Sequence, residues 1–232
     1  MRNAYHRVTD MRPFERLLLT VILAFPAVAI AQGCGSLANS YGPFDYRTSK
    51  DKLEIVEGAH FTSDVETLRA GATSSVAGDI DYTLRASPNH HRALNAMVNL
   101  SVRVQKAKPP GAHYTVDCYF ERAFRFAPDD GLVRLIYGVY LSRINRNREA
   151  IKVFEDAKKY EANNANVYYN LGLAYLDVKD YPNALENAQT AYRLGAPLPG
   201  LRARLKAAGQ WREPTQPGDE RRATDADGSV KR

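Results

Sequence analysis

The sequence contains few of the residues and patterns on which most active sites are built. It has two cysteines, one tryptophan and five histidines among 232 residues, and no H-x-x-x-H pair that would place two histidines on one face of a helix. A zinc site usually requires about four convergent ligands, so we expect no metal and no cofactor. A Gly-rich phosphate loop and a nucleophile elbow are absent as well. These absences predict a protein without enzymatic activity.

The positive charge of the sequence is modest and dispersed. The formal net charge is +6, and residues 1–31 contribute +2 of it through four arginines against one aspartate and one glutamate. The remaining +4 is mixed with acidic residues along the chain. A nucleic-acid-binding protein gathers its basic residues into a patch or stripe. We therefore expect no nucleic-acid partner.

Residues 1–31 have the composition of a secretory signal peptide. Arg12 and Arg16 precede an apolar run from Leu17 to Ala31, which ends in a small-x-small cleavage pattern. The run has 15 residues, whereas a membrane-spanning helix needs about 20. We expect an exported, periplasmic protein with no membrane span after processing.

The two cysteines have alternative uses. Residues 31–34 resemble a bacterial lipoprotein box, in which Cys34 would carry a lipid anchor and the protein would be an outer-membrane lipoprotein. In an oxidising compartment, an even pair instead favours a disulfide between Cys34 and Cys118. Such a bridge would close a loop of 84 residues and would stabilise the fold by ~4 kcal/mol in the chain-entropy treatment. A free Cys118 packed as a small hydrophobic residue is the remaining alternative.

The segment 131–198 contains a pattern that repeats after 34 residues. A fixed period of this length is typical of stacked helical hairpins, in which small residues let two helices approach closely. The same spacing extends to residues before 131. The identical pairs 34 residues apart are Gly138 and Gly172, Ala150 and Ala184, Ala157 and Ala191, Phe120 and Phe154, and Ala123 and Ala157. The pattern therefore predicts an all-α array of helical hairpins.

This pattern resembles the tetratricopeptide repeat (TPR) family. The residues of the last repeat that carry the resemblance are Tyr168, Leu171, Gly172, Tyr175, Ala184 and Ala191. Ala188 and Pro197 depart from the family pattern, and Arg134 replaces an aromatic residue in the preceding repeat. The resemblance implies a TPR-type helical-hairpin solenoid that binds a protein or peptide partner. In the stretches Tyr41–Tyr46 and Asp79–Leu94, the long N-terminal part is also similar to exported TPR proteins of Gram-negative bacteria.

Proline and glycine positions divide the sequence into five predicted parts. Residues 1–31 are the signal peptide, and residues 32–60 are an extended, aromatic-containing segment without a helical period that covers the solenoid. About four hairpins are expected over 61–211. The repeats occupy 61–198, degenerate over 61–130 and clear over 131–198, and a capping helix occupies 199–211. Residues 212–232 contain no aromatic residue and are predicted to be a disordered tail.

The resemblance to TPR proteins also implies a partner-binding groove lined by the first helices of the last two repeats. Its residues would be Leu132, Leu135, Val139, Ser142, Asn166, Tyr169, Leu173 and Leu176. Leu135 and Val139 stand where family members that clamp a carboxylate have Lys and Asn. Such an apolar groove suits an amphipathic helix, or residues 35–60 of the protein itself.

Two functions compete on these observations. The leading hypothesis is a non-catalytic interaction scaffold of the bacterial cell envelope. The alternative is an exported small-molecule binder or hydrolase that uses a cleft near His60, His90 and His91. Adjacent residues on a helix point about 100° apart, so His90 and His91 are expected to form cap or inter-hairpin contacts rather than share a metal.

Overall fold

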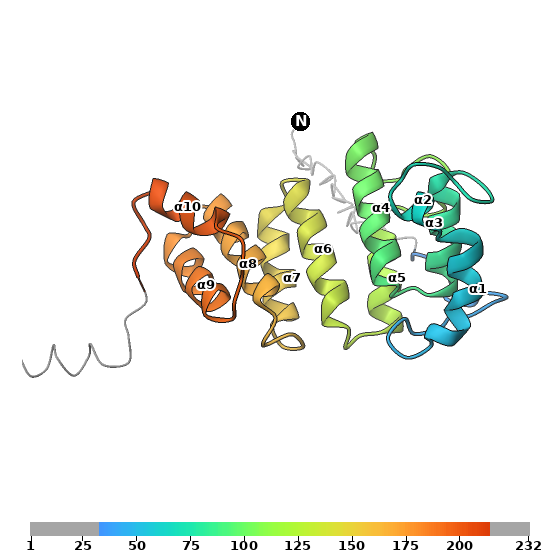
Figure 1. Cartoon of the computed structure of the whole chain (residues 1–232), viewed down its shortest axis with the longest axis horizontal. Helices are drawn as coiled ribbons and strands as arrows, with labels where there is room; N and C mark the ends of the chain where they lie inside the picture. Colours follow the sequence, from blue (N-terminus) through green and yellow to red (C-terminus); the bar gives the residue numbers. More distant parts are fainter. Residues whose placement is uncertain (1–32, 214–232) are drawn as a thin grey trace, which may run out of the picture. The chain divides into compact units, whose positions relative to one another are not determined.

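The computed structural model describes residues 33–213, and those residues form helices and no strands (Figure 1). The chain divides into two units, Met1–Gly33 and Cys34–Arg232, and the fold described below is that of the second. The signal peptide predicted for 1–31 lies outside the described residues. Of the tail predicted for 212–232, only the first two residues are described. The prediction of an all-α helical-hairpin solenoid is confirmed.

Helices follow one another along the second unit and pair with their neighbours in the chain. The pairs with the most extensive contact are α6 with α7 and α8 with α9, and α7 packs on α8 between them. The helices are α1 (Lys50–His60), α2 (Ser63–Glu66), α3 (Val76–Ala86), α4 (His91–Val104), α5 (Val116–Phe126), α6 (Gly131–Arg143), α7 (Asn147–Ala157), α8 (Ala165–Asp177), α9 (Tyr181–Arg193) and α10 (Gly200–Ala207).

Most of these helices begin at a side chain that satisfies a free backbone N–H of the first turn. This N-cap bond stabilises a helix by about 1 kcal/mol and explains why the helices begin where they do. The capping residues that accept such a bond are Ser75, His90, Thr115, Asp130, Asn164 and Asp180. The prolines and glycine between Lys106 and Gly111 separate α4 from α5, since proline cannot continue a helix.

The repeated small residues are the positions where the helices of a hairpin approach most closely. Ala150, Ala157, Ala184 and Ala191 are all completely buried. Gly138 of α6 lies against Phe154 of α7 so closely that a Cβ would overlap the phenyl ring. The 34-residue spacing thus reflects the packing of each helix pair.

The first hairpin begins earlier than the sequence indicated. Residues 34–49 contain no helix, but α1 starts at Lys50 and pairs with α3. The prediction that residues 32–60 are an extended segment is therefore wrong for α1. Only Leu53 and Val56 of α1 are buried, too few for a recognisable period, and tertiary packing stabilises the helix instead. At the other end, α10 buries Leu201 and Leu205 against α8 and α9.

The predicted disulfide between Cys34 and Cys118 is present. Their sulfur atoms lie 2.00 Å apart, and the bond joins the start of the N-terminal segment to α5. The sulfur of Cys34 cannot hold a lipid while it forms this bond. No helix within residues 33–213 combines the length and the apolar composition needed to cross a membrane.

Candidate binding groove

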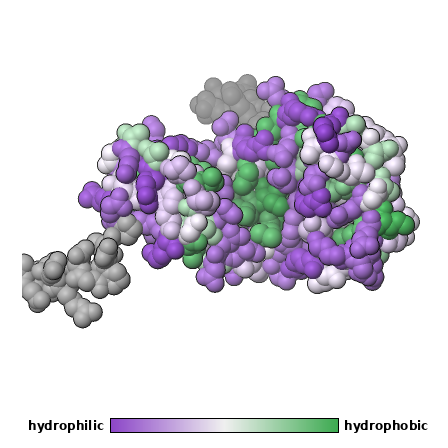
Figure 2. All heavy atoms as spheres, viewed as in Figure 1, coloured by the Kyte–Doolittle hydropathy of each residue, from purple (hydrophilic) through white to green (hydrophobic). Residues whose placement is uncertain are grey.

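The middle of the predicted groove is an apolar surface on α6. Leu132, Leu135 and Val139 are each half-buried, and Ser142 is half-buried at the end of the same row. These residues are three or four positions apart, so they share one face of the helix. Hydrophobic side chains gather over α6 on the face shown in Figure 2. These side chains therefore remain partly exposed to solvent.

The predicted groove residues of α8 divide into open and covered positions. Asn166 is exposed and Leu173 is half-buried, whereas Tyr169 and Leu176 are 8% and 7% exposed. Tyr169 and Leu176 form a buried cluster with Leu201 and Leu205 of α10. A capping helix was expected from the sequence, but the face that it covers depends on how α10 folds back on α8.

Helix α4 packs beside α6 and carries polar residues at the equivalent positions, which sequence reasoning missed. His90 caps α4 and Asp130 caps α6, so the two helices are equivalent at a shift of 40 residues. At this shift, Asn95 and Asn99 correspond to Leu135 and Val139. Nη1 of Arg143 on α6 donates a 2.5 Å hydrogen bond to Oδ1 of Asn99. The matching prolines at 88 and 128 are the sequence signal that could have revealed this alignment.

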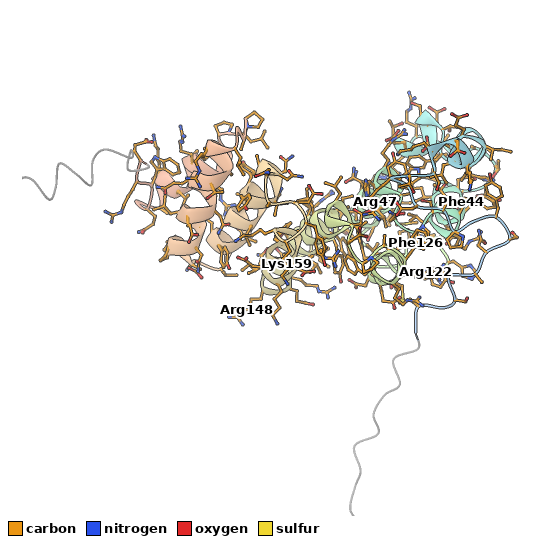
Figure 3. All side chains as sticks on the ribbon, turned by 90° about the horizontal axis from the view of Figure 1, so that it is seen from below. Phe44, Arg47, Arg122, Phe126, Arg148 and Lys159 are labelled. Carbon is orange, nitrogen blue, oxygen red and sulfur yellow. A yellow bond between two sulfur atoms is a disulfide. The ribbon has the colours of Figure 1, made fainter. Side chains whose placement is uncertain are left out.

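The N-terminal segment 34–49 packs on other surfaces than this groove. The backbone N–H of Phe44 donates to the carbonyl oxygen of Ala86 at the end of α3, and Nη1 of Arg122 on α5 donates to the carbonyl oxygens of Cys34 and Ser36. Figure 3 shows Arg122 where α5 meets this segment. The alternative in which the protein's own residues 35–60 fill the groove therefore finds no support in these contacts.

A polar junction connects the segment to the beginnings of α4 and α6. Asn89 is completely buried, and its Nδ2 donates to Oδ1 of Asp45 at 2.8 Å and to Oδ2 of Asp130 at 2.9 Å. Nη2 of Arg47 also bonds to Asp45 and to Asp129. Burial alone would raise the pKa of Asp130, but hydrogen bonds from His91 and Asn89 outweigh it and hold this pKa below its usual range. The junction fixes two adjacent inner helices relative to each other.

His90 and His91 have structural partners, as the sequence indicated. Nδ1 of His90 accepts the backbone N–H of Ala93, so the ring proton lies on Nε2 and is donated to Oε1 of Glu57 at 2.9 Å. Burial lowers the pKa of His90 to about 4. Nε2 of His91 lies 2.8 Å from Oδ2 of Asp130. Both histidines therefore connect helical hairpins.

The prediction of a cleft shared by three histidines is wrong. His90 is completely buried, and the cavity beside His60 is lined by neither His90 nor His91. The physical reason is that His90, the N-cap of α4, packs against the rings of Tyr46 and Phe61. Within residues 33–213, no three histidine, cysteine, aspartate or glutamate side chains are grouped to hold a metal ion.

Comparison with known proteins gives two partial relatives. The chain is 29% identical over 101 residues to Protein O-mannosyl-transferase TMTC3 of Mus musculus, covering 43% of this chain and 10% of that protein. It is 27% identical over 107 residues to the Homo sapiens protein of the same name, covering 45% of this chain and 11% of that protein. No protein-family model matches the chain, and no solved structure matches it.

These relatives change one prediction from the sequence. Both carry the name of a transferase, which contradicts the expectation of a protein without enzymatic activity. The chain spans about a tenth of the length of the relatives that it matches.

Proposed function

We propose that this protein is a TPR-type interaction module that binds an amphipathic helix or peptide of a protein partner in the groove over α4, α6 and α8. The observation that carries the proposal is the row of Leu132, Leu135 and Val139 on α6, whose side chains are half-buried on a face where hydrophobic residues gather (Figure 2). A partner with apolar residues at helical spacing would cover this row.

The two sides of the groove suit different parts of such a partner. Leu135 and Leu173 offer apolar contact, and burying one such side chain contributes about 1.5–3 kcal/mol. Asn95 and Asn99 of α4 offer amide groups that donate to and accept from a peptide backbone or polar side chain. Because the partial relatives are named as protein transferases, the protein substrate of a transferase is one partner that this groove would hold.

We further propose that the protein is exported and acts in the periplasm of a bacterial cell envelope. The apolar run from Leu17 to Ala31 supports export. The bond between Cys34 and Cys118 supports an oxidising compartment. A mature N-terminus at Gln32 in the envelope fraction, measured by mass spectrometry, is the expected result. A lipid mass on Cys34 would show instead that the protein is an outer-membrane lipoprotein.

The groove is tested by introducing a negative charge at two half-buried apolar positions. The variant Leu135→Asp with Leu173→Asp places two carboxylates on the apolar face without removing a fully buried side chain. Arg148→Asp on the exposed outer side of α7 is the matched control (Figure 3). Partners cross-linked by the unaltered protein and by the control should be lost from the double variant, provided that circular dichroism shows the same helix content. Retention of every partner by the double variant would show that the groove is not the binding site.

A further inference from the structure

The first hairpin has an apolar pocket at the free side of α1. The pocket has a volume of about 330 Å³ and is lined by Tyr41, Ile55, Val56, Ala59, His60 and Tyr82. Ile55 is 69% exposed. The end repeats of a solenoid normally present a polar outer face to water. Ile55 and the apolar pocket beside it depart from this pattern.

One polar side chain in the pocket, His60, is held in a defined orientation. Nδ1 of His60 lies 3.1 Å from Oδ1 of Asp79, which is completely buried, and 2.9 Å from Oγ1 of Thr73. The hydroxyl of Thr73 itself donates to Oδ1 of Asp79 at 2.6 Å. The His60 ring also stacks on Tyr82, with the ring centroids 3.9 Å apart.

The partners of Asp79 determine which nitrogen of His60 carries the proton. The backbone N–H groups of Ala72, Thr73 and Ser74 donate to Oδ2 of Asp79. Burial alone would raise the pKa of Asp79, but the hydrogen bonds from Thr73, His60 and the backbone hold it well below its usual range. An ionised carboxylate only accepts, so Nδ1 of neutral His60 must donate to it. Nε2 then keeps its lone pair and has no hydrogen-bond partner among the residues that the structure describes.

We propose that this pocket binds a small planar aromatic molecule that carries an N–H or O–H group, such as an indole or a phenol. The apolar side chains of Ile55, Val56 and Ala59 contact the ring, and its N–H or O–H donates to Nε2 of His60. A cavity of about 150 Å³ holds a benzene molecule, so this pocket has room for a bicyclic ring. The site is formed by α1, α3 and Tyr41 and shares no residue with the groove over α6.

The proposal is tested by comparing indole with 1-methylindole, which has nearly the same shape and lacks the N–H. Dissociation constants for the full chain are measured by ligand-observed NMR. Indole should bind about fivefold more tightly, which is the effect of one net hydrogen bond. His60→Phe keeps a ring on Tyr82 but removes the acceptor, so it should bring indole to the affinity of 1-methylindole.

A second variant separates binding from folding. Ile55→Lys changes an exposed residue and so leaves the fold intact, but it places an ammonium group at the apolar wall and should weaken both ligands about tenfold. Glu54→Lys, at the adjacent exposed position of α1, is the matched control and should bind as the unaltered protein does. Equal affinity for the two indoles, no binding of either, or full binding by the Ile55→Lys variant would each overturn the proposal.

Discussion

Nη1 of Arg122 donates a 2.6 Å hydrogen bond to the backbone carbonyl oxygen of Ser36, which is 86 residues away in the sequence. The same nitrogen donates to the carbonyl oxygen of Cys34 at 3.0 Å. Arg122 is only 2% exposed, and its guanidinium lies over the ring of Tyr114. A buried arginine and a disulfide thus attach the same end of the N-terminal segment to α5.

Replacing Arg122 by methionine should loosen this attachment. Arg122→Met keeps an unbranched side chain but leaves the carbonyl groups of Cys34 and Ser36 without their donor, which should lower the free energy of unfolding by about 2 kcal/mol. Arg125→Met is the control, because exposed Arg125 donates to the carbonyl of neighbouring Gly35 and its loss should cost less than about 0.5 kcal/mol. Urea denaturation measures both, and equal effects would contradict the role given to Arg122.

Reduction of the Cys34–Cys118 bond should destabilise the folded protein. The bond closes a loop of 84 residues, which corresponds to ~4 kcal/mol in the chain-entropy treatment. For a domain of this size, the melting temperature should fall by roughly 8–16 °C at most. Thiol titration of the denatured, non-reduced protein should detect no free cysteine. A reactive thiol in that titration, or an unchanged melting temperature after reduction, would contradict the prediction.

Two glycine-to-alanine substitutions should have opposite effects. Gly138→Ala places a methyl group into the Phe154 ring, and overpacking of this kind costs about 1–3 kcal/mol. At Gly58 of α1, a Cβ would meet no atom within 4 Å. Gly58→Ala should therefore stabilise the helix by about 0.5–1 kcal/mol. Thermal melts of both variants provide the comparison, and a stable Gly138→Ala protein would show that the repeated glycine is not a packing requirement.

The free energy of unfolding should decrease as the pH falls and His90 binds a proton. Burial lowers its pKa from 6.5 to about 4 in the folded state. Between these two pH values the unfolded chain binds a proton that the folded protein does not bind. The stabilisation is therefore complete above pH 6.5 and is lost as the pH falls toward 4, by at most about 3 kcal/mol.

The variant His90→Asn isolates this contribution. Asparagine also caps a helix and does not titrate, so the difference in unfolding free energy between the two proteins should change with pH only in this window. Urea denaturation at several pH values from 7.5 to 4.5 measures it. Parallel pH profiles for the two proteins would contradict the prediction.

Much of the architecture could be predicted because repeats carry their packing rules locally. Gly138, Phe154 and Ala157 each have an identical residue 34 positions away. They recur because each hairpin packs its two helices with the same small and large residues. The apolar row on α6 could be predicted from the same repeat spacing. Helix α1 did not, because its two buried residues form no period and its stability comes from α3.

The sequence by itself determined the helical hairpins, their repeat length and the apolar row on α6, since these depend on contacts between residues near one another in the chain. Only the tertiary structure decided that α10 covers Tyr169 and that Asn99 accepts a hydrogen bond from Arg143. It also decided that Asp79 orients His60. Such relationships join residues brought together by the stacking of whole helices, and their direction and distance leave no periodic trace in the sequence.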